Sequence, residues 1–102
     1  MKRFRPHIVV DNTRRPTQVL PAAENILKRF ARHASMAAFE TSSCVILSMK
    51  IPASINPADL YEQFYEAVGD GVTAVVHEKN VEIKMPKDLY AAGFTPASAY
   101  FN

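Results

Sequence analysis

Short runs of apolar residues along this chain have the length and composition of β-strands. Residues 7–11 and residues 44–51 are rich in Ile and Val, and each run predicts a strand. The near-continuous apolar start of the second run is typical of a central, buried strand, and Pro52 ends it. The polar residues 41–43 indicate a loop directly before this strand.

Helical spacing predicts a first helix over residues 21–35, with a continuation to residue 39 left open. Pro21 suits a first helical position, and Glu24 lies near the positive end of the helix dipole. The apolar positions recur every three or four residues and would form one buried face. They are Ala23, Ile26, Leu27, Phe30, Ala34, Ala37 and Ala38.

A second helix is indicated after residue 56. Asn56 is a favourable N-cap, and Pro57 occupies the preferred first position. Leu60, Phe64 and Val68 follow helical spacing and predict its apolar stripe, and a nearby glycine, at 69 or 71, can end it.

A β-hairpin is predicted over residues 72–78 and 81–85, because both runs are rich in β-branched residues and the second alternates apolar with charged residues. Lys79 and Asn80 would form its tight turn, although they lack the ideal turn chemistry. A short helix over residues 86–92, between a proline and a glycine, completes the pattern.

The element order is therefore β-α-β-α-β-β, which predicts an α+β fold with two helices packed on one face of a roughly four-stranded sheet. A length of 102 residues fits one domain. We expect that domain to span residues 7–102 and to follow a flexible basic arm of residues 1–6.

Composition narrows the cellular locations that we expect for the protein. Apolar residues make up 48% of the chain, but no run approaches the roughly 20 residues that span a bilayer. Cys44 is the single cysteine, which is typical of a protein from a reducing compartment. No apolar segment follows the basic N-terminal residues as it would in a signal peptide, so we expect a cytoplasmic location.

The sequence contains no recognisable catalytic constellation. His7, His33 and His77 are far apart, and Cys44 opens an apolar strand as structural cysteines often do. No glycine-rich phosphate loop precedes a helix. We therefore expect no enzyme activity, no metal and no cofactor.

Charge is distributed unevenly along the chain. Residues 1–33 contain eight Lys and Arg residues against two acidic ones, and residues 34–102 contain four against eight. Two candidate binding faces follow from this asymmetry. The basic face comprises Arg14, Arg15, Lys28, Arg29 and Arg32, and the acidic face comprises Asp59, Glu62 and Glu66 on one side of the second helix.

Opposed charges of this kind favour a non-enzymatic binding module, and we interpret the chain as a small protein-binding regulator or inhibitor of a larger complex. The alternative is a nucleic-acid-binding protein that uses the basic face and the N-terminal arm, since arginine suits phosphate. Both faces could also be merely solvated. Self-association through an edge strand, at residues 81–85 or 8–10, is a further expectation.

Overall fold

The computed structural model describes residues 14–92. The basic arm of residues 1–6 and the strand expected over residues 7–11 lie outside the described residues. The glycine expected to close the last helix, Gly93, lies outside them as well.

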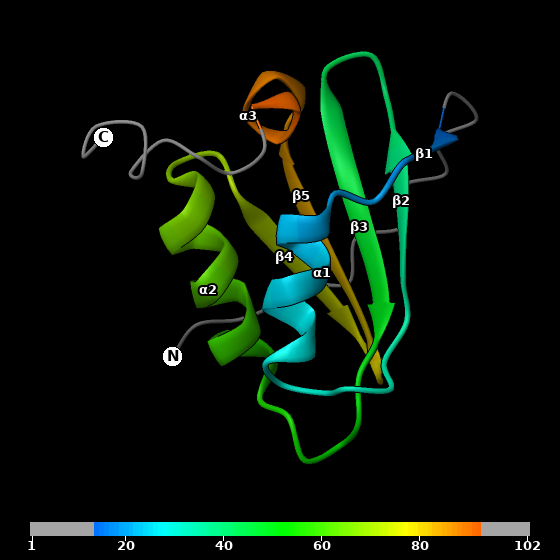
Figure 1. Ribbon diagram of the computed structural model, residues 1–102, viewed down its shortest axis with the longest axis vertical. Helices are drawn as coiled ribbons and strands as arrows, with labels where there is room; N and C mark the ends of the chain where they lie inside the picture. The colour runs from blue at the N-terminus through cyan, green and yellow to red at the C-terminus, as the bar shows by residue number, and fades with distance from the viewer. Residues whose placement is uncertain (1–13, 93–102) are drawn as a thin grey trace.

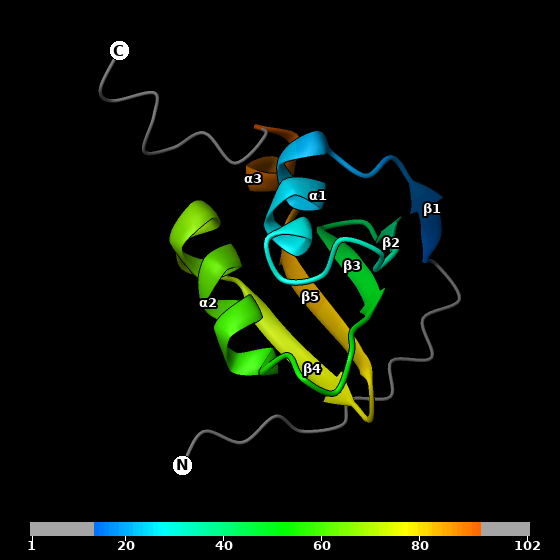
Figure 2. The same ribbon diagram turned by 60° about the horizontal axis from the view of Figure 1, so that its bottom comes forward.

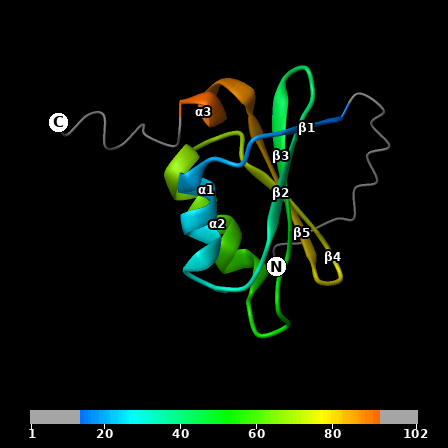
Figure 3. The same cartoon turned by 45° about the vertical axis from the view of Figure 1, so that its right-hand side comes forward.

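Five antiparallel strands form one sheet in the order β1-β2-β3-β5-β4 (Figure 1). The strands are β1 (Arg15–Thr17), β2 (Met36–Glu40), β3 (Cys44–Lys50), β4 (Thr73–His77) and β5 (Asn80–Pro86). The helices are α1 (Pro21–Lys28), α2 (Pro57–Val68) and α3 (Lys87–Ala91). Figure 3 shows the helices on one side of the sheet, so the predicted α+β fold with two main helices on one face is confirmed.

The first helix is shorter than predicted. α1 ends at Lys28, and the segment that would have continued it to residue 39 contains strand β2 instead. Ala38 has helical spacing from α1, but it pairs with Leu47 and is buried in the sheet. The Thr41 hydroxyl accepts a hydrogen bond of 3.1 Å from the backbone N–H of Cys44 and supports a hairpin between β2 and β3. Pairing along the whole of β2 therefore outweighs the helix propensity of its alanines.

Strand β1 was not predicted, because Pro16 lies within it. Proline cannot donate to a ladder and is tolerated on an edge strand, where its nitrogen can face away from the neighbouring strand. β1 is such an edge strand, paired only with β2 in the described part of the chain.

The predictions for β3 and α2 are confirmed. β3 is the central strand of the five. The Asn56 side chain caps α2 by accepting a hydrogen bond of 3.0 Å from the backbone N–H of Ala58. Gly69 ends this helix with a φ of 93°, a value that glycine adopts without the steric cost of a side chain.

The predicted hairpin forms between β4 and β5, but its turn lies one residue earlier than expected. His77 pairs with Asn80, so Glu78 and Lys79 are the turn residues, and Glu78 has a φ of 55°. β5 also pairs with β3 on its other side. The expectation that residues 81–85 form an exposed edge is therefore wrong, and the edge beside them belongs to β4.

The core lies between the helices and the sheet. Leu27 of α1 and Leu60 and Phe64 of α2 are almost completely buried, as are Leu47 of β3 and Ile83 of β5. Burial of side chains of this size stabilises a fold by about 1.5–3 kcal/mol each. This packing fixes the loops at the ends of the strands relative to α1 and α2.

Candidate functional site

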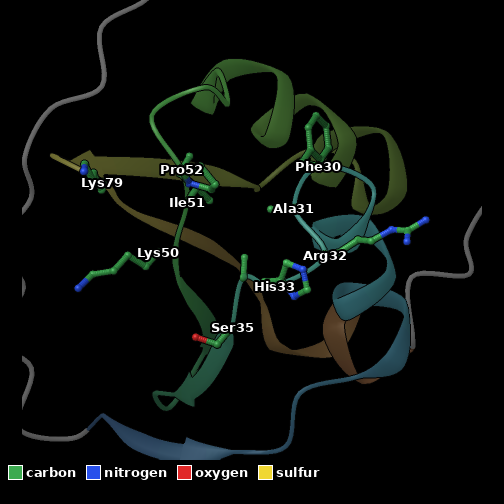
Figure 4. Close-up of a pocket in the computed structure, with 10 residues that line it drawn as sticks. Phe30, Ala31, Arg32, His33, Ser35, Lys50, Ile51, Pro52 and Lys79 are labelled. Atoms are coloured by element: carbon green, nitrogen blue, oxygen red, sulfur yellow. The ribbon is translucent and has the colours of Figure 1, made fainter.

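A hollow of about 550 Å³ lies between the segment that follows α1, the C-terminal end of β3 and the β4–β5 turn (Figure 4). Three segments line it, and we call it the basic hollow. They are residues 30–35 after α1, residues 50–52 at the end of β3, and Lys79 in the β4–β5 turn.

Backbone hydrogen bonds hold these segments together. The N–H of Ile51 donates to the carbonyl of Lys79 over 2.9 Å, which extends the β3–β5 pairing by one residue. On the α1 side, the N–H groups of Phe30 and Ala31 both donate to the Leu27 carbonyl at 3.0 Å. Shared acceptors of this kind occur where an α-helix tightens at its end. This tightening turns the chain out of α1 and into residues 30–35, which line the hollow.

The floor of the hollow is apolar. Ile51 is 4% exposed, and Phe30 and Ala34 are partly buried against the hydrophobic core. Ala31 and Pro52 complete the apolar lining. This surface can accept an apolar side chain of a binding partner.

The rim of the hollow is cationic. Arg32, Lys50 and Lys79 are exposed there together with His33, and no Asp or Glu of residues 14–92 lines the hollow. Within residues 14–92, none of the three cationic side chains forms an ion pair. Figure 4 shows the Lys50, Lys79 and Arg32 side chains extending away from the floor toward its surroundings. The hollow therefore presents unneutralised positive charge to an incoming ligand.

The basic face expected from the sequence is not one surface. Arg14 forms an ion pair of 3.0 Å with Glu82 and covers the Phe39 ring, with 4.6 Å between the guanidinium carbon and the ring centroid. Arg15 is exposed on β1, opposite Glu40. Both arginines belong to the β1 edge of the sheet, away from the end of α1.

The α1 cations are also partly engaged. Lys28 lies 3.6 Å from Glu24, one helical turn earlier. Arg29 donates a hydrogen bond of 2.9 Å to the Gln63 side chain and so bridges α1 and α2. Of the five predicted basic residues, the hollow gathers only Arg32.

The acidic face is present as a solvent-exposed ridge on α2. Asp59, Glu62 and Glu66 are all exposed. Glu66 accepts a weak hydrogen bond of 3.5 Å from Gln63, on the α1 side of the helix. Glu62 lines a different hollow, together with Tyr61 and Tyr65.

Lys50 and Lys79 were missed by the sequence reasoning. They are 29 positions apart, and only the antiparallel pairing of Lys50 with Asn80 brings them together. The one available signal was their position: Lys50 is next to last in the strand predicted over residues 44–51, and Lys79 directly follows the run of residues 72–78, near loops that lie on the surface.

The described residues offer no metal centre. No group of three or more His, Cys, Asp or Glu side chains within residues 14–92 is arranged to hold a metal ion. Cys44 is half-buried at the start of β3, with the Ser43 hydroxyl 3.6 Å from its sulfur. None of the helices among these residues has the length and apolar character needed to cross a membrane.

Comparison of the chain with protein-family models, with curated proteins and with solved structures finds no match in any of the three. The geometry of the molecule is therefore the sole basis for the functional interpretation below.

Proposed function

We propose that the chain is a non-enzymatic protein-binding module, a small regulator or inhibitor of a larger complex, and that its basic hollow binds an acidic segment of the partner. The observation that carries this proposal is the cationic rim of Arg32, Lys50 and Lys79 over an apolar floor, with no neutralising carboxylate from the described part of the chain. A partner segment with one apolar side chain flanked by Asp or Glu would satisfy both parts of this surface. Electrostatic attraction would orient the segment, and burial of its apolar side chain would retain it.

Nucleic acid is the competing ligand, and the geometry favours it less. Single strands are usually bound by exposed aromatic rings that stack on the bases. Among the described residues, Phe30 is the one phenylalanine or tyrosine in the lining, and it is partly buried against the core. Arg14, Lys28 and Arg29 would have contributed phosphate contacts, but they already contact Glu82, Glu24 and Gln63.

The proposal is tested by capture from host lysate with the immobilised full chain after nuclease treatment. The double variant Lys50→Glu/Lys79→Glu reverses the charge of the rim. Its matched control, Lys28→Glu/Lys84→Glu, makes the same change in charge at exposed positions outside the hollow. We expect the immobilised wild type and the control to capture the same partner protein. The rim variant should fail to capture it.

A synthetic peptide of alternating Glu and Leu and a single-stranded oligonucleotide serve as defined probes in fluorescence anisotropy. Tighter binding of the peptide, weakened at least tenfold in the rim variant, supports the proposal. Binding of the oligonucleotide alone, with affinity that falls steeply as salt rises, would instead establish the nucleic-acid alternative. Equal capture by the rim variant and the wild type would refute a role for the hollow.

A further inference from the structure

Strand β4 is at the outer end of the sheet (Figure 2). It pairs with β5 along its whole length: Thr73 lies opposite Lys84 at one end, and His77 lies opposite Asn80 at the other. Within the described residues, no strand pairs with its other side. Among residues 14–92, the backbone groups on that side of β4 therefore have no strand partner.

The two edges of the sheet differ in how well they are protected. β1 has only three residues, and Arg15 and Pro16 both discourage pairing with a further strand. β4 has five residues, and none of them is Asp, Glu, Lys, Arg or Pro. Its pairing with β5 is continuous and contains no bulge. In the described part of the chain, β4 therefore has no strand-breaking proline, no Lys, Arg, Asp or Glu side chain and no bulge to prevent edge-to-edge association.

The outward-facing groups of β4 follow from the ladder. His77 and Asn80 close a two-residue turn and form a hydrogen-bonded pair, and hydrogen bonding to β5 then alternates along the strand. The N–H and C=O groups of Ala74 and Val76 consequently point away from β5. These two residues have partly buried side chains on the core side of the sheet, while Val75 lies on the helix-free side.

An aromatic surface lies beside this edge. Gln63 faces α1, and Tyr61 and Tyr65 project from the other flank of α2. The Tyr61 hydroxyl donates a hydrogen bond of 3.1 Å to the Val72 carbonyl, directly before β4. Tyr65 is 41% exposed, and its hydroxyl donates to the Asp70 carboxylate over 2.9 Å. A hollow of about 390 Å³ opens along this flank.

We propose that the outer edge of β4, with the exposed Tyr65 beside it, forms a homodimer interface, in which β4 pairs antiparallel with β4 of a second copy. A two-fold axis at Val75 places Ala74 opposite Val76 of the copy, and each pair exchanges two backbone hydrogen bonds. Val75 meets its own counterpart on the helix-free side. The five-stranded sheets become one continuous sheet of two copies.

A second copy fits this edge because the outward N–H and C=O groups of one β4 lie opposite the matching C=O and N–H groups of the other. An antiparallel strand is related to its copy by a two-fold axis, which closes the assembly at two chains. β4 contains no Asp, Glu, Lys or Arg that would meet a like charge across the axis. The same pairing brings the Asp70 end of each strand beside the Lys79 end of the other.

Sedimentation velocity of the full chain across the micromolar range tests the proposal. The first variant, Val75→Lys, places two ammonium groups at the axis. The second, Ala74→Pro, removes one outward N–H without removing a bond to β5. The matched control is Ala37→Lys, at an exposed position on the same side of the sheet in β2.

We expect the wild type and Ala37→Lys to sediment as dimers at high concentration and both β4 variants to remain monomers with an unchanged far-ultraviolet circular dichroism spectrum. A wild type that stays monomeric throughout would overturn the proposal, as would dimers that persist in both folded β4 variants. A loss of folding in Ala74→Pro would contradict the outward direction of that N–H. None of these outcomes requires the basic hollow to bind a ligand.

Discussion

The Tyr90 hydroxyl accepts a hydrogen bond of 2.8 Å from the backbone N–H of Leu20, which is 70 residues earlier in the chain. The same hydroxyl donates to the carbonyl of Gln18. Tyr90 belongs to α3, and Leu20 is the N-cap of α1, whose side chain makes no capping hydrogen bond. The short helix α3 therefore fixes the start of α1 and, through α1, one wall of the basic hollow.

Replacement of Tyr90 by Phe should destabilise the fold. Tyr90 is 6% exposed, so Phe would preserve most of its packing while leaving the Leu20 N–H and the Gln18 carbonyl without their partner. An unsatisfied group of this kind costs about 1–3 kcal/mol, and we expect a loss in that range from urea denaturation. The control Tyr65→Phe removes an exposed hydrogen bond to Asp70 and should cost less. Equal stability of Tyr90→Phe and wild type would show that the two hydrogen bonds of the Tyr90 hydroxyl do not stabilise the fold.

Gly71 and Pro86 lie close enough to be energetically coupled. Gly71 has a φ of +98°, and a Cβ built there would be 2.9 Å from Cγ of Pro86. Gly71→Ala should therefore destabilise by about 1–3 kcal/mol through backbone strain and the clash together. Pro86→Ala in the same chain should recover the clash component, which appears in a double-mutant cycle as a coupling of about 0.5 kcal/mol or more.

Gly69 provides the control for this cycle. It also has a positive φ, of +93°, but a Cβ there would have no atom within 4 Å. Gly69→Ala should destabilise through strain alone and show no coupling to Pro86→Ala. Additive free energies for the Gly71 pair would show that the contact with Pro86 has no energetic effect.

Local capping and turn signals made part of this fold predictable. Asn56 and Pro57 mark the start of α2 because their effect depends on adjacent backbone groups. By contrast, Ala38 fits a helix and a strand equally well by spacing, and its state is decided by pairing with Leu47. Propensity alone could not reveal that choice.

The candidate site was less predictable, because it depends on contacts between distant segments. The sequence shows Arg14 and Arg29 as members of a basic cluster, but not that Glu82 and Gln63 lie within 3.0 Å of them. It also shows a hairpin of β4 and β5 without showing that β5 lies next to β3. That strand order is what brings Lys50 to the side of Lys79.

The β4–β5 turn should be improved by substitution of Glu78. Glu78 has a φ of 55°, in the left-handed region that costs a residue with a Cβ roughly 1–2 kcal/mol. Asn adopts this region more readily and is favoured in two-residue turns. We expect Glu78→Asn to raise the free energy of unfolding by up to about 1 kcal/mol. The control Glu62→Asn, at an exposed position of α2, should not raise the free energy of unfolding. An increase equal to that of Glu78→Asn would exclude turn strain as the cause.

Glu40 and Lys87 should couple stability to pH. Their ion pair of 2.9 Å joins β2 to α3. The hydrogen bond and the charge of Lys87, together with the charge of Arg15, lower the pKa of the Glu40 carboxyl below its usual value despite some desolvation. In the unfolded chain the carboxyl regains its ordinary pKa, so as pH falls through this range the unfolded state binds the proton first.

The stability that Glu40 contributes is therefore complete above the ordinary carboxyl pKa and is lost as pH falls through the lowered pKa of the folded state. Carbon-detected nuclear magnetic resonance should show the pKa of Glu40 moving back up in Lys87→Met. The acid side of the unfolding profile should become shallower in the same variant. Because Arg15 remains, we expect the return to be incomplete, and Arg15→Met/Lys87→Met should raise the pKa of Glu40 further than Lys87→Met alone. An unchanged titration of Glu40 in Lys87→Met would show that the ion pair does not form in solution.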